Sequence, residues 1–294
     1  MSITKYQIFL KTAACGSFSK AAEAMNFTQS GISHAINSLE GELGVTLLSR
    51  NRGGVVLTAD GRALLPQIEK LCAAHHTMMQ TVESLKGMDS GLVKVATFSS
   101  VSFLWLPRIL KSFGQIYPNI EFEVITGDYY EQIESWIVSG AVDCGFFRLP
   151  STKHLQTYPL YRDELQVVVL CDHVYAQEDP FPASELAEEP FILLEEGEDY
   201  EIMAAFDKLG IRPHVKYTAR EDRTILAMVS EGLGISLLPR LMVSHSPLPV
   251  QVCRAPLQFD RTIGIGVKDE KALSKSTRLF VDYVRTWVAE NGDK

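Results

Sequence analysis

The chain has 294 residues, 46% of them hydrophobic, and a formal net charge of −8. This length and composition exclude a disordered or fibrous chain and are typical of a soluble globular protein with two or three domains. The acidic balance excludes binding of polyanions over the whole surface, although residues 1–61 carry five basic and only four acidic side chains.

The sequence indicates neither a membrane protein nor an oxidising compartment. No run of about 18 apolar residues predicts a membrane-spanning helix, and lysines within an amphipathic pattern stand where a signal peptide would be apolar. The five cysteines are scattered and lack metal-binding spacing: Cys15, Cys72, Cys144, Cys171 and Cys253. We expect reduced thiols, with a redox-sensing pair as the alternative, in a cytoplasmic protein without a membrane partner.

The first forty-four residues predict three short helices. Apolar residues recur at helical spacing over residues 3–13 before Gly16, and over residues 18–25 after Ser17, which is placed as a cap. A third helical stripe follows Thr28, another capping residue. Since only three residues separate the second and third helices, we predict a helix-turn-helix whose second helix reads the DNA major groove.

The outer face of the third predicted helix is polar but uncharged in its first half. It carries Gln29, Ser30, Ser33, His34 and Asn37. Asn and Gln pair bidentately with adenine edges, and serine bonds to bases or phosphates, so this face is predicted to read DNA sequence. The alternative is a face that only caps and solubilises a surface helix.

Residues 45–61, VTLLSRNRGGVVLTADG, predict a β-hairpin with a tight glycine turn. A hairpin directly after a recognition helix is a wing, and Arg50 and Arg52 at its tip are placed to meet phosphates or the minor groove. A merely solvated turn is the alternative. The predicted DNA-binding set also includes Ser17, Lys20 and Thr28.

This N-terminal pattern resembles that of the LysR-type transcriptional regulators. The matching positions are Phe9, Gly16, Ser17, Phe18, Ala21, Ala22, Thr28, Gln29, Ser33, Ile36, Leu39, Glu40, Leu43, Gly44, Leu47, Arg50, Leu57, Thr58 and Gly61. The chain departs from the pattern at Ser30-Gly31, where the family often has Pro-Ala, and at Leu48-Ser49, where it often has Phe followed by an acid. Neither departure removes a predicted contact residue.

A long helix is predicted from Thr58 to about Gly87. Its apolar positions alternate at spacings of four and three residues, which indicates a coiled-coil seam. The seam consists of Leu64, Ile68, Leu71, His75, Met78, Val82 and Leu85. The resemblance implies that this is the family's linker helix, which joins two chains as a homodimer or a dimer of dimers. His75 is interpreted as a polar residue that fixes register, with a pH-sensitive dimer contact as the alternative.

Strand-like and helix-like runs alternate after a break at residues 87–91, which predicts an α/β body with a parallel sheet. The resemblance implies two lobes like those of periplasmic binding proteins. The expected organisation is a winged helix-turn-helix at 1–58, a linker helix and hinge at 59–90, and an effector domain at 91–294. Within it, lobe I is expected at 91–162 and 266–294 and lobe II at 163–265, with the chain crossing near 161–163 and 264–268.

Ligands of such sheets bind beyond the carboxyl ends of the strands. This rule predicts the effector contacts Ser99, Ser100, Ser102, Thr126, Gly127, Arg148, Glu195 and Glu196. Helix capping is the alternative for the serines. Arg148 is suited to a carboxylate, whereas the acidic loop at 195–199 favours a cationic or amide-bearing effector, so the charge of the effector stays open.

No hydrolase, P-loop, zinc-protease or dinucleotide-binding motif is present, so an enzyme, a cofactor and a metal site are not expected. The rival hypothesis is a ligand-binding or hydrolytic α/β protein whose N-terminal helices serve only as an interaction module. The preferred function is an effector-controlled transcriptional regulator. Its expected partners are double-stranded DNA with two-fold related half-sites, a small-molecule effector, further copies of itself and RNA polymerase.

Overall fold

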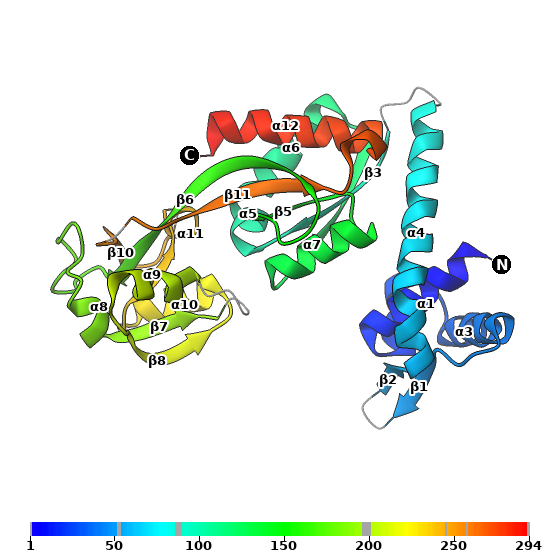
Figure 1. The fold of residues 1–294 in the computed structure, drawn as a ribbon, viewed down its shortest axis with the longest axis horizontal. Helices are drawn as coiled ribbons and strands as arrows, with labels where there is room; N and C mark the ends of the chain where they lie inside the picture. Colours follow the sequence, from blue (N-terminus) through cyan, green and yellow to red (C-terminus); the bar gives the residue numbers. More distant parts are fainter. Residues whose placement is uncertain are drawn as a thin grey trace.

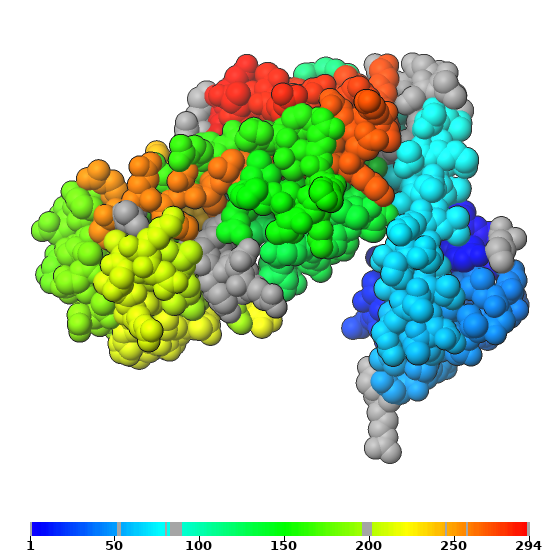
Figure 2. Space-filling model, in the orientation of Figure 1, coloured from blue at the N-terminus to red at the C-terminus, as the bar shows by residue number. Residues whose placement is uncertain are grey.

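The computed structural model describes residues 2–51, 54–85, 90–195, 201–244, 246–256 and 258–292. An N-terminal head, a long helix and a two-lobed body follow one another along the chain (Figure 1). In the space-filling view the head and the long helix stand at one end of the body (Figure 2). None of the helices in the described ranges is long and apolar enough to cross a membrane.

The head consists of three helices and a hairpin. The helices are α1 (Ile3–Cys15), α2 (Phe18–Met25) and α3 (Gln29–Leu43), and strands β1 (Leu48–Asn51) and β2 (Gly54–Leu57) pair in antiparallel register. The apolar stripes predicted from periodicity meet in one core, where Phe9, Ile32 and Leu39 are fully buried. Left-handed glycines end α1 and α3 at Gly16 and Gly44, because glycine adopts a positive φ without strain.

The hairpin is fixed to the helices by side-chain and backbone contacts. Glu40 of α3 accepts hydrogen bonds through one carboxylate oxygen from the backbone N–H groups of Leu47 and Leu48, at 2.7 and 3.0 Å. The first turn of the long helix lies against the carbonyl oxygen of Leu47, and a Cβ added to Gly61 would lie only 2.1 Å from that oxygen. A glycine is therefore required at position 61 for this packing.

The long helix α4 (Ala59–Leu85) contributes to the head as well as to the predicted seam. Ile68 is 5% exposed within the head core, and Leu64 packs against the same core. In the single chain these two seam positions therefore contribute to the head core, and their role in a dimer stays a prediction. Leu71, Met78 and Val82 are exposed by 45%, 54% and 36%, while the side chain of Leu85 lies outside the described residues.

α4 also contacts the body. His76 on α4 lies 3.3 Å from the Asp143 carboxylate, which accepts a hydrogen bond from the backbone N–H of Lys94 at 2.7 Å. A Cβ added to Gly140 would lie 2.6 Å from the methyl carbon of Ala73. The linker helix thus packs closely on the first lobe, next to α7 in Figure 1.

Lobe I is a sheet covered by helices. It contains β3 (Gly91–Thr97), α5 (Ser99–Leu104), α6 (Leu106–Ile116), β4 (Ile120–Thr126), α7 (Tyr130–Ser139), β5 (Cys144–Leu149), the 3-10 helix η1 (Glu270–Ala272) and the C-terminal helix α12 (Lys275–Asn291). β3 pairs in parallel with β4 and β5, as the alternating pattern predicts. Phe113, Phe146 and Phe280 lie in its core.

Lobe II has its own core. It contains α8 (Glu185–Glu188), β7 (Pro190–Leu194), α9 (Glu201–Leu209), β8 (His214–Ala219), α10 (Asp222–Ser230), β9 (Ser236–Pro239), α11 (Arg240–Val243) and β10 (Val250–Arg254). β7 and β8 form a parallel pair, and Phe181, Phe191 and Phe206 lie in the core.

Two long antiparallel strands, β6 (Gln156–Leu170) and β11 (Asp260–Val267), run between the lobes (Figure 1). On β6 the chain passes from the first core at Tyr161 to the second core at Leu165. It returns between Phe259, which packs in the second core, and Ile263, which is buried in the first. The return therefore lies earlier than the predicted 264–268, because the alternating side chains of β11 already point into lobe I from Ile263 onward.

Candidate functional site

The polar face of α3 is available to a partner. Gln29, Ser30, His34 and Asn37 are exposed and Ser33 is half-buried, next to the buried stripe that contains Ile32 and Ile36. Amides and hydroxyls in this arrangement are the groups that recognise base edges when a helix lies in the major groove.

Two of the predicted DNA contacts already have structural roles as helix caps. The Ser17 hydroxyl accepts a hydrogen bond from the backbone N–H of Lys20 at 3.4 Å, and the Thr28 hydroxyl accepts one from Gly31 at 3.1 Å. Thr28 also shares a hydrogen bond with the Ser30 hydroxyl at 3.1 Å. These caps fix the starts of α2 and α3 and therefore the direction of the reading face. The Lys20 side chain is exposed beside them.

The wing presents a fixed cation. The guanidinium carbon of Arg50, on β1, lies 4.7 Å from the centre of the Phe18 ring at the start of α2. This cation–π contact orients an otherwise exposed side chain, so a positive charge stands beside the helix-turn-helix. Arg52 lies outside the described residues.

A pocket of about 350 Å³ lies between the two lobes, and residues from both lobes and from β11 line it. Its walls are Phe98, Ser99, Ser102, Phe103, Thr126, Gly127, Asp128, Tyr129, Tyr130, Leu194, Glu195, Arg220, Glu221, Asp222, Arg223, Met242 and Arg261. Five predicted effector contacts are among them: Ser99, Ser102, Thr126, Gly127 and Glu195. They meet here because the carboxyl ends of β3, β4 and β7 face the same crevice.

Two of the predicted contacts are placed differently. Ser100 is 1% exposed and lies behind the pocket wall, where its hydroxyl bonds to other side chains. Arg148 does not line the pocket; its guanidinium carbon lies 5.8 Å from the ring centre of Tyr130, and it is the tyrosine that reaches the pocket. Arg148 thus stays a predicted contact outside this wall, because α7 places an aromatic ring where β5 was expected to present a cation. Glu196 lies outside the described residues.

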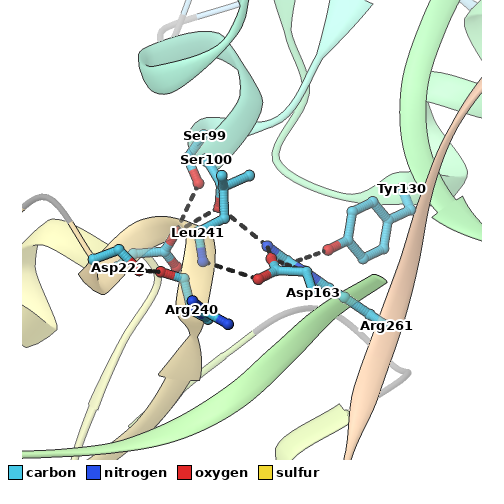
Figure 3. Close-up of polar contacts among 9 residues, drawn as sticks. Ser99, Ser100, Tyr130, Asp163, Asp222, Arg240, Leu241 and Arg261 are labelled. Carbon is cyan, nitrogen blue, oxygen red and sulfur yellow. Dashed lines mark hydrogen bonds and ion pairs between the residues drawn. The ribbon is translucent and has the colours of Figure 1, made fainter. Parts of the chain in front are cut away.

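Arg261 lines the pocket and forms a buried ion pair with Asp163 behind it (Figure 3). Arg261 on β11 donates two hydrogen bonds to one carboxylate oxygen of Asp163 on β6, at 3.1 and 2.9 Å. It also donates to the hydroxyl oxygens of Tyr130 at 2.7 Å and Ser100 at 3.2 Å. The other oxygen of Asp163 accepts a hydrogen bond from the backbone N–H of Leu241 at 2.9 Å. This network joins both crossing strands to both lobes.

Asp222, at the start of α10 in lobe II, reaches across to lobe I (Figure 3). Its carboxylate accepts hydrogen bonds from the hydroxyls of Ser99 at 3.0 Å and Ser100 at 3.4 Å. Burial raises the pKa of the Asp222 carboxyl, while nearby Arg261 and the two serine hydroxyls act in the opposite direction. The contact is a direct bond between the lobes at the pocket wall.

Sequence reasoning missed Asp163, Asp222 and Arg261. The run Arg220-Glu221-Asp222-Arg223 follows β8, so the rule of strand carboxyl ends was sufficient to identify it. The pairing of Asp163 with Arg261 depends on the antiparallel register of β6 and β11, which no local pattern reveals. Among the described residues no group of three or more His, Cys, Asp or Glu side chains is arranged to hold a metal ion.

The fold and the two sites define a winged helix-turn-helix protein with a ligand-binding body of two α/β lobes. Residues 3–62 match the model of the bacterial regulatory helix-turn-helix protein, lysR family, and residues 86–289 match that of the LysR substrate binding domain. The chain therefore belongs to the LysR family of transcriptional regulators.

Relatives and solved structures agree with this assignment. The uncharacterized HTH-type transcriptional regulator YvbU of Bacillus subtilis is 31% identical over 97% of this chain and 98% of its own length. The probable HTH-type transcriptional regulator LrrA of Synechococcus elongatus is 31% identical over 99% and 98%. Full-length CbnR, solved with its target DNA, has the same fold at 21% identity, with a TM-score of 0.71 over 97% of this chain and 99% of CbnR. The protein is thus a DNA-binding transcriptional regulator with an effector-binding domain, not an enzyme.

Proposed function

We propose that this regulator acts in the cytoplasm as a homodimer or a dimer of dimers on operators with two-fold related half-sites. The observation that carries the proposal is the exposed, uncharged α3 face beside the wing cation Arg50. A dimer places two such faces on one side of the DNA, so that protein symmetry is mirrored in the operator.

In this proposal Gln29, Ser33 and Asn37 contact base edges, with Ser30 and His34 beside them. Ser17, Lys20, Thr28 and the wing arginines contact phosphates or the minor groove. Phosphate contacts position the protein on the duplex, whereas the amide and hydroxyl contacts carry sequence information.

Dimerisation uses the outer half of α4. Leu71, Met78 and Val82 stand in heptad spacing on the helix and are exposed in the single chain, with half-buried His75 between them. Exposed apolar side chains at this spacing are suited to knobs-into-holes packing against a second copy.

The effector binds in the interlobe pocket. Since β6 and β11 connect the lobes and polar contacts such as that of Asp222 bridge them, a ligand that contacts both lobes changes their relative angle. The linker helix transmits this change, because α4 packs on lobe I through His76 and Ala73. The spacing or bend of the bound DNA then changes, and with it the contact with RNA polymerase.

The test is selective mapping of the purified full-length protein on fragmented DNA from its own genome, with affinity followed against salt concentration. We expect discrete sites with two-fold related half-sites and an affinity that falls steeply with salt. Weak binding without preferred sites would contradict the proposal. That outcome would favour the rival hypothesis, in which the N-terminal helices are an interaction module on a ligand-binding body.

A further inference from the structure

We propose that the effector of this regulator is an organic cation, held with its ammonium group against Asp222 and its apolar part against the aromatic wall of the pocket. The inference rests on the proposed function in one respect: it takes the interlobe pocket to be the effector site.

The charges around the pocket do not cancel. The described wall contains three arginines, Arg220, Arg223 and Arg261, and four carboxylates, Asp128, Glu195, Glu221 and Asp222. A fifth carboxylate, Asp163, lies directly behind Arg261. The site therefore carries more negative than positive charge.

Two of the arginines are already neutralised. Arg261 is paired with Asp163 at 2.9 Å, both fully buried, and Arg220 is paired with Glu195 at 3.1 Å. Arg223 lies with its guanidinium carbon 3.3 Å from the centre of the Phe103 ring, where it is exposed at the rim. Two of the three cations are thus paired with carboxylates, and only Arg223, at the rim, keeps an uncompensated charge.

Asp222 is the carboxylate with the greatest need of a cation. It is only 5% exposed and lines the pocket, and its hydrogen-bond donors Ser99 and Ser100 are neutral hydroxyls. The charge of nearby Arg261 also favours the ionised form of Asp222, but the ion pair of Arg261 is with Asp163. A buried carboxylate without a paired cation is costly, and an ammonium group beside it compensates that cost. Asp128 and Glu221, which make no ion pair within the described chain, add to the negative potential at the same pocket.

The hydrogen bonds from Ser99 and Ser100 to Asp222 also prevent a carboxylate ligand from binding to these two hydroxyls. Ser99 and Ser100 donate their hydroxyl hydrogens to Asp222. A carboxylate that approached them would have to displace Asp222 and would meet its charge at close range. Two of the serines predicted as effector contacts are therefore already bonded to a carboxylate of the protein itself.

The remaining wall suits an apolar or aromatic body. Phe98, Phe103, Tyr129, Tyr130 and Met242 line the pocket together with its charged groups. A volume of about 350 Å³ is that of a small metabolite site. Arg223, Arg261 and Arg148 already lie over the rings of Phe103, Phe98 and Tyr130. These rings therefore provide apolar contact for the body of the ligand, and the carboxylates provide the attraction for its charge.

The experiment compares ligands that share a carbon skeleton and differ only in the charged group. Isothermal titration calorimetry on the full-length protein would use tyramine against 3-(4-hydroxyphenyl)propanoate, phenethylamine against 3-phenylpropanoate, and pentylamine against hexanoate. We expect at least one amine to bind at least tenfold more tightly than its matching carboxylate. Tighter binding of the carboxylates, or binding of none of the six compounds, would overturn the proposal.

The charge preference should depend on Asp222. In Asp222→Asn, which keeps the shape of the side chain and its bonding capacity, we expect the preference for the amine to fall at least tenfold. Asp128→Asn should reduce it less, and Asp207→Asn, the same change on an exposed residue of lobe II away from the pocket, should leave it unchanged. An undiminished preference in Asp222→Asn would contradict the assignment, and Asp128→Asn provides a second test if Asp222→Asn does not fold.

The proposal can fail separately from the proposed function. Binding of the same protein to mapped operator fragments is measured alongside the titrations. Specific DNA binding combined with tighter binding of the carboxylates would overturn only the proposal that the effector is a cation. If the wild-type protein showed no specific DNA binding, the proposed function would be overturned, whatever the pocket binds.

Discussion

Removing the Asp163 carboxylate should destabilise the body strongly. Asp163 and Arg261 have side chains that are 0% and 2% exposed, and they are joined by two hydrogen bonds of 2.9 and 3.1 Å. Asp163→Ala leaves the guanidinium buried without its counter-charge, which costs about 3–5 kcal/mol in comparable pairs. It also leaves the backbone N–H of Leu241 without its acceptor. We therefore expect a loss of about 3–5 kcal/mol in the free energy of unfolding.

Tryptophan fluorescence during urea unfolding is a suitable assay. The chain has three tryptophans, Trp105, Trp136 and Trp287, and all of them pack in the core of lobe I. Their signal therefore reports the unfolding of the lobe whose sheet contains β11.

The control is an exposed pair in the same lobe. Asp282 lies 3.5 Å from Arg285 on α12, with side chains 63% and 48% exposed. Asp282→Ala should change the unfolding free energy by no more than about 1 kcal/mol, because water screens such pairs. The double variant Asp163→Ala with Arg261→Met should be more stable than Asp163→Ala alone, since it no longer buries an unpaired charge. If Asp163→Ala lowered the free energy of unfolding by no more than Asp282→Ala does, the buried ion pair would not have the stabilising role assigned to it.

Four further predictions concern the head and the pocket. Gly61→Ala should destabilise the head by about 1–3 kcal/mol in thermal unfolding followed by circular dichroism, because its Cβ would lie 2.1 Å from a backbone oxygen of the wing. Asp222→Asn should stabilise the protein relative to wild type at pH 7, and do so less as the pH falls through the raised pKa of Asp222, measured by chemical unfolding. Ser33→Ala should weaken operator binding by about 1 kcal/mol, whereas Arg50→Ala should weaken binding to all sequences and lower the salt slope by about 1.

The sign of the pH effect follows from the direction of the pKa shift. Burial raises the pKa of Asp222 above the ordinary value of 3.8, so the ionised carboxylate is less favourable in the folded than in the unfolded state. This penalty is present at neutral pH and is relieved as the pH falls through the raised pKa, because the folded protein then takes up the proton first. An Asn side chain carries no such penalty at any pH. If the difference in the free energy of unfolding between Asp222→Asn and wild type did not change with pH, the raised pKa of Asp222 would be contradicted.

The other predictions have equally direct controls. Gly41→Ala places a methyl group where nothing lies within 4 Å, so it should raise stability by about 1 kcal/mol through helix propensity. Equal losses in the Gly41 and Gly61 variants would show that the wing contact is unimportant. If Arg50→Ala altered base preference but left the salt slope intact, the assignment of the wing to the DNA backbone would be wrong.

The sequence by itself determined the head and the order of the elements. Helical periodicity, the capping hydroxyls of Ser17 and Thr28 and the terminal glycines Gly16 and Gly44 predicted α1, α2 and α3, because each signal acts between residues a few positions apart. The rule of strand carboxyl ends likewise brought Ser99, Ser102, Thr126, Gly127 and Glu195 to one crevice.

Only the tertiary structure decided which of these groups act together. Asp163 and Arg261 are 98 positions apart and meet through the register of two antiparallel strands, and Asp222 meets Ser99 across 123 positions because the lobes face each other. Tertiary packing also separates the apolar positions of α4 into two groups. The head buries Ile68, while Leu71 stays exposed. A periodic pattern states that one side of an element is apolar, but which surface covers that side depends on how distant segments pack.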